Sequence, residues 1–163
     1  MPDFLFDDRV IITEAIISPT ASVREFSVVT RSVVGKGTRI GPFAHVLNEC
    51  EVGAFCQIGN FVVLDKCNLS DNVKINHHSA LVYVTVGEDT IIGAGCMIDI
   101  PLSGASHTII GANVFVGSSV CLASGIEIGD NVIIGAGSNV NCNLPSNSFF
   151  VNRPRTKTLK VRL

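Results

Sequence analysis

The stretch that decides the fold is residues 34–58, which read VGKGTRIGPFAHVLNECEVGAFCQI. Every sixth residue in it is aliphatic, and the same spacing, with occasional steps of five, continues in both directions. The aliphatic positions are Ile17, Val23, Val29, Val34, Ile40, Val46, Val52, Ile58, Leu64, Leu69, Ile75, Leu81, Val86, Ile92, Ile98, Ile110, Val116, Leu122, Ile128, Ile134 and Val140. A period of six matches neither the 3.6-residue period of a helix nor the wider spacing of a hairpin meander.

A six-residue unit accommodates one short strand and one corner. Three such units make a triangular coil of about 18 residues, in which aliphatic side chains stack in columns and each coil covers the edge of the previous one. Glycine, which directly follows many of the aliphatic residues, and asparagine suit the corners because both tolerate left-handed backbone angles. The repeat therefore predicts an all-β fold, a parallel β-helix of hexapeptide repeats over residues 17–145.

The flanking segments lack the repeat. We expect residues 1–16 to be an N-terminal cap segment in which Phe4, Leu5 and Phe6 cover the open first coil. Residues 146–163 form a short basic C-terminal tail that contains Arg153, Arg155, Lys157, Lys160 and Arg162. A basic tail of this kind either binds phosphate or is simply solvated.

Composition agrees with one mainly β domain. The 163 residues are 47% hydrophobic and 16% charged, and Val and Ile greatly outnumber Leu, which favours strands over helices. The net charge is −2, and no apolar run reaches the 18 residues of a membrane helix. We therefore expect a cytoplasmic protein with neither nucleic-acid nor membrane partners.

Six cysteines occur without a C-x-x-C spacing, which favours reduced, buried thiols. Cys50, Cys56 and Cys96 each follow an aliphatic position by four residues, where the repeat places a small inward side chain. The repeat breaks once, between Ile98 and Ile110, where Gly104 replaces the aliphatic residue. We expect the coil to keep its length there and residues 101–107 to leave the wall as a short loop, a favoured place for binding residues.

Three stretches resemble one family in particular. They are Ile40-Gly-Pro-Phe-Ala44, Ile58-Gly-Asn-Phe-Val62 followed by Lys74-Ile-Asn76-His77, and Thr108-Ile-Ile-Gly111 followed by Val114-Phe-Val-Gly-Ser118. They are similar to the hexapeptide-repeat acyltransferases, most of all to the C-terminal acetyltransferase domain of the bifunctional glucosamine-1-phosphate acetyltransferase and N-acetylglucosamine-1-phosphate uridylyltransferase. The resemblance implies a left-handed β-helix, a homotrimer and acetyl-CoA as the acyl donor, with no metal.

The resemblance places the catalytic histidine of the family on His77. The repeat puts His77 in register with Pro42, Asn60 and Ala94 on one face. A neutral imidazole near pH 7 can accept the proton that an amine loses as it attacks a thioester. The competing interpretation is a surface or interface histidine without chemistry.

The coenzyme A contacts of the family correspond to Ser118, Ala136 and Arg153, with Arg155 beside them. Arginine suits this role because its guanidinium pairs with phosphate oxygens. On the acceptor side the resemblance retains Lys74 and Asn76, and Asp65 is a candidate to orient His77 or to contact the acceptor amine.

The acceptor side also departs from the family pattern. Leu47, Asp65, Ala80 and Ile91 stand where the family has arginine, lysine, tyrosine and asparagine, its loop lysine falls near Ala105, and Val63 replaces a glutamate that supports the histidine. We therefore expect an acetyltransferase that acts on an amino sugar or sugar nucleotide other than glucosamine-1-phosphate, by direct transfer.

Two alternatives stay open. The first is a non-catalytic trimeric β-helix that serves as a scaffold or interaction module. The second is a zinc site built from His45, His77, His78 and His107. The adjacent His77 and His78 are expected on opposite sides of a strand, which opposes the metal site.

Overall fold

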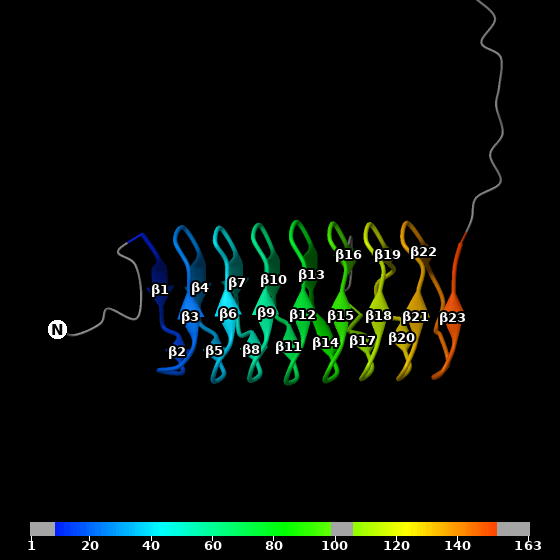
Figure 1. Cartoon of the computed structure of the whole chain (residues 1–163), viewed down its shortest axis with the longest axis horizontal. Helices are drawn as coiled ribbons and strands as arrows, with labels where there is room; N and C mark the ends of the chain where they lie inside the picture. The colour runs from blue at the N-terminus through cyan, green and yellow to red at the C-terminus, as the bar shows by residue number, and fades with distance from the viewer. Residues whose placement is uncertain (1–8, 99–105, 153–163) are drawn as a thin grey trace, which may run out of the picture.

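The chain winds into a straight solenoid of short parallel strands (Figure 1). The structure is a computed structural model that describes residues 9–98 and 106–152. No helix occurs among these residues, and accordingly none is long and apolar enough to cross a membrane. Successive strands lie on three different walls, so every third strand returns to the same wall one coil further on.

Each wall is one parallel sheet. Wall 1 contains β1 (Ile11–Thr13), β4 (Val28–Thr30), β7 (His45–Leu47), β10 (Val63–Asp65), β13 (Ala80–Val82), β16 (Met97–Ile98), β19 (Cys121–Leu122) and β22 (Asn139–Val140). Wall 2 contains β2 (Ile16–Ile17), β5 (Val33–Val34), β8 (Glu51–Val52), β11 (Asn68–Leu69), β14 (Val84–Val86), β17 (Thr108–Ile110) and β20 (Glu127–Ile128). Wall 3 contains β3 (Ser22–Val23), β6 (Arg39–Ile40), β9 (Gln57–Ile58), β12 (Lys74–Ile75), β15 (Ile91–Ile92), β18 (Phe115–Val116), β21 (Ile133–Ile134) and β23 (Phe149–Phe150).

The predicted left-handed parallel β-helix is confirmed. Ile40 pairs with Ile58 and Ile58 pairs with Ile75, so a coil takes the expected 17 or 18 residues. The pairing of β1 with β4, and of β21 with β23, extends the β-helix beyond the predicted bounds of 17–145 at both ends. The proposed cap residues Phe4, Leu5 and Phe6 lie outside the described residues.

The aliphatic positions of the repeat form the core. All of them are buried except Ile17, which is partly buried and packs against the core. In each two-residue strand the second residue points inward and the first points outward, as in Arg39–Ile40 and Gln57–Ile58. Because strands of this length are not stable alone, the stacking of these side chains between coils holds the solenoid together.

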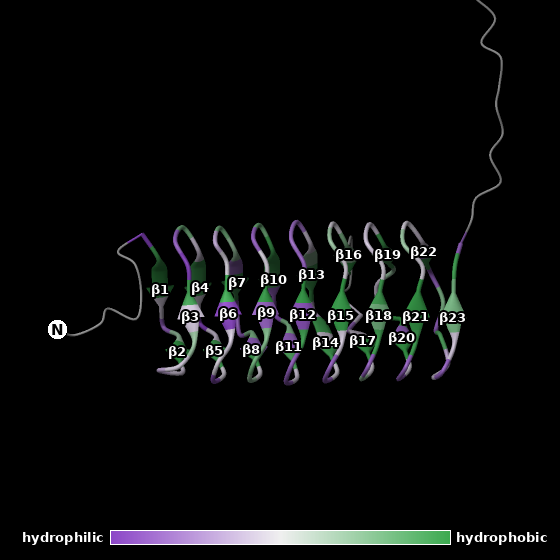
Figure 2. Ribbon diagram, viewed as in Figure 1, coloured by the Kyte–Doolittle hydropathy of each residue, from purple (hydrophilic) through white to green (hydrophobic). Residues whose placement is uncertain are grey.

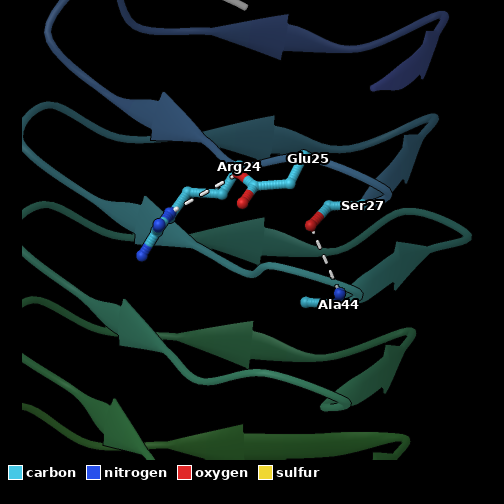
Figure 3. Close-up of polar contacts among 4 residues, drawn as sticks. All are labelled: Arg24, Glu25, Ser27 and Ala44. Carbon is cyan, nitrogen blue, oxygen red and sulfur yellow. Dashed lines mark hydrogen bonds and ion pairs between the residues drawn. The ribbon is translucent and has the colours of Figure 1, made fainter. Parts of the chain in front are cut away.

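Buried hydroxyl groups form a second internal feature, which the sequence analysis missed. Each of them accepts a backbone N–H from the next coil, as Ser27 Oγ does from Ala44 at 3.2 Å (Figure 3). The residues are Ser27, Ser32, Thr38, Ser79, Thr90, Thr108 and Ser138. These hydroxyls satisfy corner amides that the parallel ladders leave without a partner.

One coil is longer than predicted. Val86 pairs with Ile110, a separation of 24 residues (110 − 86), whereas Ile40 and Ile58 are 18 apart and Ile58 and Ile75 are 17 apart. The coil that contains the stretch between β16 and β17 is therefore six residues longer than the predicted 18. The expectation that this coil keeps its length is wrong.

Residues 99–105, which include Gly104 and Ala105, lie outside the described part of the chain.

Four of the six cysteines are buried as predicted. Cys50, Cys56 and Cys96 are core residues with no exposed surface, and Cys67 is 1% exposed. Burial raises the pKa of Cys56 and of Cys96. Cys121 and Cys142 are exposed and free, so the expectation of buried thiols is wrong for these two. Cys121 is the outward residue of β19, which explains its exposure.

A prediction for stability follows from the buried hydroxyls. Ser79 Oγ donates to the Gly93 carbonyl at 3.0 Å and accepts the Cys96 N–H at 3.1 Å. Ser79→Ala leaves both buried groups unpaired and should lower the free energy of unfolding by about 1–3 kcal/mol in denaturant titrations. The matched control Ser22→Ala, on the outer face of β3, should change it little. Equal effects of the two substitutions would contradict this role of the hydroxyls.

Thiol reactivity tests the core assignment. Two thiols, those of Cys121 and Cys142, should react with a disulfide reagent at pH 8 in the folded protein. The other four should react only after unfolding, because burial limits access to all of them. For Cys56 and Cys96 the raised pKa also keeps the thiol protonated. Spectrophotometric titration gives both numbers, and rapid reaction of four or more thiols in the native protein would disprove the packing.

Candidate functional site

The corner between wall 3 and wall 1 carries His77. The pairing of β12 with β15, of β15 with β18 and of β18 with β21 puts equivalent corner residues in one line along the solenoid. The line that contains His77 consists of Pro42, Asn60, His77, Ala94, Ser118 and Ala136. We call it the His77 column. The predicted register is confirmed, and the structure adds that Ser118 and Ala136 stand in the same column.

Beside the His77 column, the same corner carries a ladder of stacked aromatic rings in the N-terminal coils. Phe26, Phe43 and Phe61 stack on one another with centroids 5.0 Å apart, and His78 continues the stack at 4.9 Å from Phe61. All four residues have positive φ, which turns the chain through the corner. Left-handed backbone conformations are unfavourable for residues that carry a side chain, and stacking between the rings stabilises them at these positions. We call these four residues the aromatic ladder.

In the coils that follow His78, this corner has no large side chains. The positions that continue the aromatic ladder are Gly95, Ser119 and Gly137, all with positive φ. A Cβ atom at Gly137 would meet nothing within 4 Å, and one at Gly95 only Ser119 Oγ at 3.7 Å. Together with Ala94, Ser118 and Ala136, these residues form a strip of small residues that starts at His77 and runs toward the C-terminal coils, over about 14 Å at 4.8 Å per strand. We call this strip the trough, because the large rings of the preceding coils are absent from it.

His77 is exposed at the start of the trough. Its backbone carbonyl accepts the Gly95 N–H at 2.9 Å, which fixes the main chain. Its ring touches the His78 ring edge to face, with centroids 5.5 Å apart. The expectation that the two histidines point to opposite sides of a strand is wrong, because both lie in a corner. In the described part of the chain no hydrogen bond or ion pair occupies the His77 ring.

Asp65 lies away from His77. It ends β10 at the corner between walls 1 and 2, pairs with Val82, and accepts a 2.9 Å hydrogen bond from Asn48 Nδ2. Asn48 Oδ1 in turn accepts from Arg31. His77 precedes β13 at the opposite end of wall 1. The predicted orienting contact between Asp65 and His77 is therefore absent within this chain.

Lys74 and Asn76 lie next to His77 on wall 3. Lys74 is the outward residue of β12, and Asn76 Nδ2 donates to the Ile92 carbonyl at 3.0 Å. Both line a surface hollow of about 280 Å³. Arg153 and Arg155, the predicted contacts to coenzyme A phosphates, lie outside the described residues.

A second polar contact, on wall 2, was not found by sequence reasoning. His107 Nε2 lies 2.7 Å from Thr85 Oγ1, and the His107 ring meets Tyr83 edge to face at 4.6 Å. The insertion before β17 brings them together, and no spacing in the sequence indicates it. Among the described residues, no three His, Cys, Asp or Glu side chains gather into a group that could hold a metal ion.

Comparison with known families supports the repeat. Residues 31–66 and 107–142 match the family described as bacterial transferase hexapeptide (six repeats). Together with the three-walled solenoid, this match shows that the chain carries the hexapeptide repeat of that family.

Two relatives show how similar the sequence is to individual proteins of this type. The chain is 47% identical over 70 residues to the bifunctional protein GlmU of Nostoc sp., a match that covers 43% of this chain and 16% of the relative. It is 36% identical over 135 residues to GlmU of Gloeothece citriformis, which covers 82% of this chain and 30% of that protein. The predicted resemblance is thereby confirmed. The chain spans less than a third of the length of these relatives.

Solved structures share the fold. The UDP-N-acetylglucosamine O-acyltransferase LpxA of Moraxella catarrhalis superposes with a TM-score of 0.64 at 16% identity, over 91% of this chain and 65% of that one. A mutant of AntD, an N-acyltransferase from Bacillus cereus in complex with dTDP-4-amino-4,6-dideoxyglucose and coenzyme A, gives 0.61 at 17% identity, over 94% and 84%.

Proposed function

We propose that this protein is an acetyl-CoA-dependent acetyltransferase that acts on an amino sugar or sugar nucleotide other than glucosamine-1-phosphate. The observation that carries the proposal is the His77 column. A histidine without a polar partner among the described residues stands at the start of a strip of small residues that contains Ala94, Ser118 and Ala136. A slender thioester chain fits such a trough, and its reactive end would then meet the imidazole.

In this mechanism His77 is the general base. The acceptor amine attacks the thioester carbonyl carbon, a C–N bond forms, and the amine proton passes to the neutral imidazole. Backbone N–H groups at the corner stabilise the oxyanion of the tetrahedral intermediate. The C–S bond then breaks, and the coenzyme A sulfur leaves with the proton that His77 holds. The amide forms by direct transfer, without an acyl-cysteine.

The donor site extends along the trough. Ser118 and Ala136 line it and, being small, leave it open. We assign the coenzyme A phosphates to Arg153 and Arg155, because a guanidinium pairs well with phosphate oxygens. AntD, whose fold is shared, binds coenzyme A, and this supports an acyl-CoA donor.

The acceptor differs from that of the family. Leu47 and Ala80 are outward residues of β7 and β13, and Ile91 is that of β15, so apolar groups stand where the family has polar side chains. We therefore exclude glucosamine-1-phosphate from the proposal. Lys74 and Asn76, beside His77, are the proposed contacts to the acceptor. Asp65 is retained as a contact supplied by a neighbouring subunit, since it does not reach His77 within its own chain.

A homotrimer is part of the proposal. Phe115, Ile133 and Phe149 are 48%, 48% and 67% exposed along the second half of wall 3, which is a large apolar surface for a free solenoid. Burial between subunits would remove it from water. Sedimentation equilibrium should give three times the chain mass, and a monomeric mass at micromolar concentration would contradict the assembly.

A scaffold without catalysis is the second candidate. It is favoured by the engagement of Asp65 with Asn48 and by the apolar residues at the acceptor positions. Acetyl-CoA binding separates the two functions. Calorimetric binding in the micromolar range supports the enzyme, and no binding at high micromolar concentration supports the scaffold.

Substitution of His77 tests the general base. His77→Ala should lower kcat by about 10²- to 10⁴-fold, the usual contribution of a positioned base, and leave the Kd for acetyl-CoA unchanged. The assay is release of the free coenzyme A thiol across a panel of amino sugars and sugar nucleotides. His45→Ala, on the outer face of β7, is the matched control and should retain wild-type turnover. Equal rates for His77→Ala and the wild type would remove His77 from the mechanism.

Filling the trough tests the donor site. Ala136→Phe places a ring across the trough and should raise the Kd for acetyl-CoA at least tenfold in calorimetry. Ala112→Phe is the matched control, because Ala112 occupies the same repeat position at the corner between walls 2 and 3. Both variants should keep the wild-type unfolding midpoint. Unchanged affinity in Ala136→Phe would place the donor elsewhere.

A further inference from the structure

A cationic hollow lies on wall 3, on the N-terminal side of His77. Its volume is about 280 Å³, and its polar lining is Arg24, Arg39, Gln57, Lys74 and Asn76. Register places Arg39, Gln57 and Lys74 opposite one another on adjacent strands β6, β9 and β12. We call this the wall 3 hollow.

Glycines form its floor. Gly41 and Gly59 follow the inward residues of β6 and β9 and line the hollow. A Cβ atom at Gly59 would lie 2.9 Å from the backbone nitrogen of His77, so the coils approach too closely for any other residue. The absence of side chains at these two positions leaves open space between Arg24 on one coil and Asn76 three coils further on.

The hollow concentrates positive charge. Arg39 and Lys74 have no carboxylate within ion-pair distance in the described part of the chain, and Arg24 has only Glu25, at 3.7 Å (Figure 3). Arg39 and Lys74 are two strands apart, about 9–10 Å, so their long side chains can converge on one ligand above Gln57. Unpaired cations held close together favour the binding of an anion, and phosphate oxygens suit both guanidinium and ammonium groups.

Other hollows on the described surface differ in charge. One of about 580 Å³ contains Glu127 and Asp130, another contains Glu51 and Asp71, and a third places Asp89 beside Lys74. No carboxylate lines the wall 3 hollow. It therefore has the electrostatic character that a phosphate requires, and the other three do not.

Wall 3 changes character at His77. Figure 2 shows hydrophilic residues on β6, β9 and β12 and hydrophobic residues on β15, β18 and β21. The outward residues of the second group are Ile91, Phe115 and Ile133. The trough proposed for the donor runs from His77 along the second group of coils, and the hollow lies on the first. The two sites thus meet at His77 from opposite directions.

We infer that the wall 3 hollow binds a phosphate or diphosphate group of the acceptor, through Arg39 and Lys74 with Arg24 in support. Assignment of this group to the acceptor rests on the proposed function. Lys74 is three residues from His77, so their Cα atoms are at most about 11 Å apart. A phosphorylated amino sugar can span that distance with its phosphate in the hollow and its amine at His77. The substrate class is therefore a sugar phosphate or a nucleoside-diphosphate sugar that carries a free amine.

Binding of inorganic pyrophosphate tests the hollow without any acyl transfer. Calorimetry on the full chain at low salt should show saturable binding that weakens as salt is added. Arg39→Gln and Lys74→Gln should each raise the Kd about tenfold or more, because each removes a charge-assisted contact. Lys66→Gln, an exposed cation at the corner between walls 1 and 2, should leave it unchanged, and Arg39→Lys should restore part of the affinity. All four changes lie outside the core, and their unfolding midpoints provide the check on folding.

Two comparisons identify the source of the phosphate. Acetyl-CoA should bind wild type and Arg39→Gln with equal affinity, whereas a loss of acetyl-CoA affinity in Arg39→Gln would assign the hollow to the donor and overturn the inference. In the amino-sugar panel, KM for a phosphorylated acceptor should rise in Arg39→Gln at nearly constant kcat.

The pyrophosphate and activity measurements together distinguish failure of the phosphate site from failure of the proposed acetyltransferase. Pyrophosphate binding that depends on Arg39, without any acetyl transfer, would support the phosphate site and count against the enzyme. Active wild-type enzyme whose pyrophosphate affinity and acceptor KM are the same in Arg39→Gln would overturn the phosphate site and leave the enzyme standing. Absence of saturable pyrophosphate binding to the wild type at millimolar concentration would also overturn it.

Discussion

Hydrogen bonding between coils is the constraint on which the structure depends. Each strand has only two or three residues and forms its ladder with the coil before and the coil after it, as β12 does with β9 and β15. No coil can satisfy its backbone alone, so a residue is placed by the register of its neighbours. The buried aliphatic columns keep this register, because a slip of one residue would turn every inward side chain outward.

The same register builds the candidate site. It aligns His77 with Ala94, Ser118 and Ala136, which come from four coils, and it stacks His78 on Phe61. The change from aromatic rings to Gly95, Ser119 and Gly137 removes the large side chains from this corner. Where the rings end, the polar outer face of wall 3 ends too, so His77 marks the boundary between two halves of the solenoid that differ in chemistry.

Sequence reasoning succeeded where the six-residue period acts directly. It predicted the columns, the buried Cys50, Cys56 and Cys96, and the shared face of His77, Asn60 and Ala94. It failed where contacts depend on which wall a residue joins. The sequence predicts that Asp65 orients His77, yet the two residues lie at opposite ends of wall 1. The sequence also predicts the wrong length for the coil before β17. Gly104 stands at a repeat position, and the spacing of the repeat is the same whether this stretch forms part of a wall or a loop.

The sequence by itself determined that the chain is a β-helix with an aliphatic core, because periodic burial leaves the same signal in every unit. It also placed a candidate base in the repeat. Only the tertiary structure decided that Ser27, Thr38 and Ser79 bond to the next coil, and that Arg39 and Lys74 flank one hollow beside His77. The hydrogen bonds to these backbone amides join residues 17 or 18 positions apart, and Arg39 and Lys74 are 35 positions apart (74 − 39). Their proximity arises from the stacking of coils. The six-residue period predicts this stacking, but it does not specify which side chains meet across neighbouring coils.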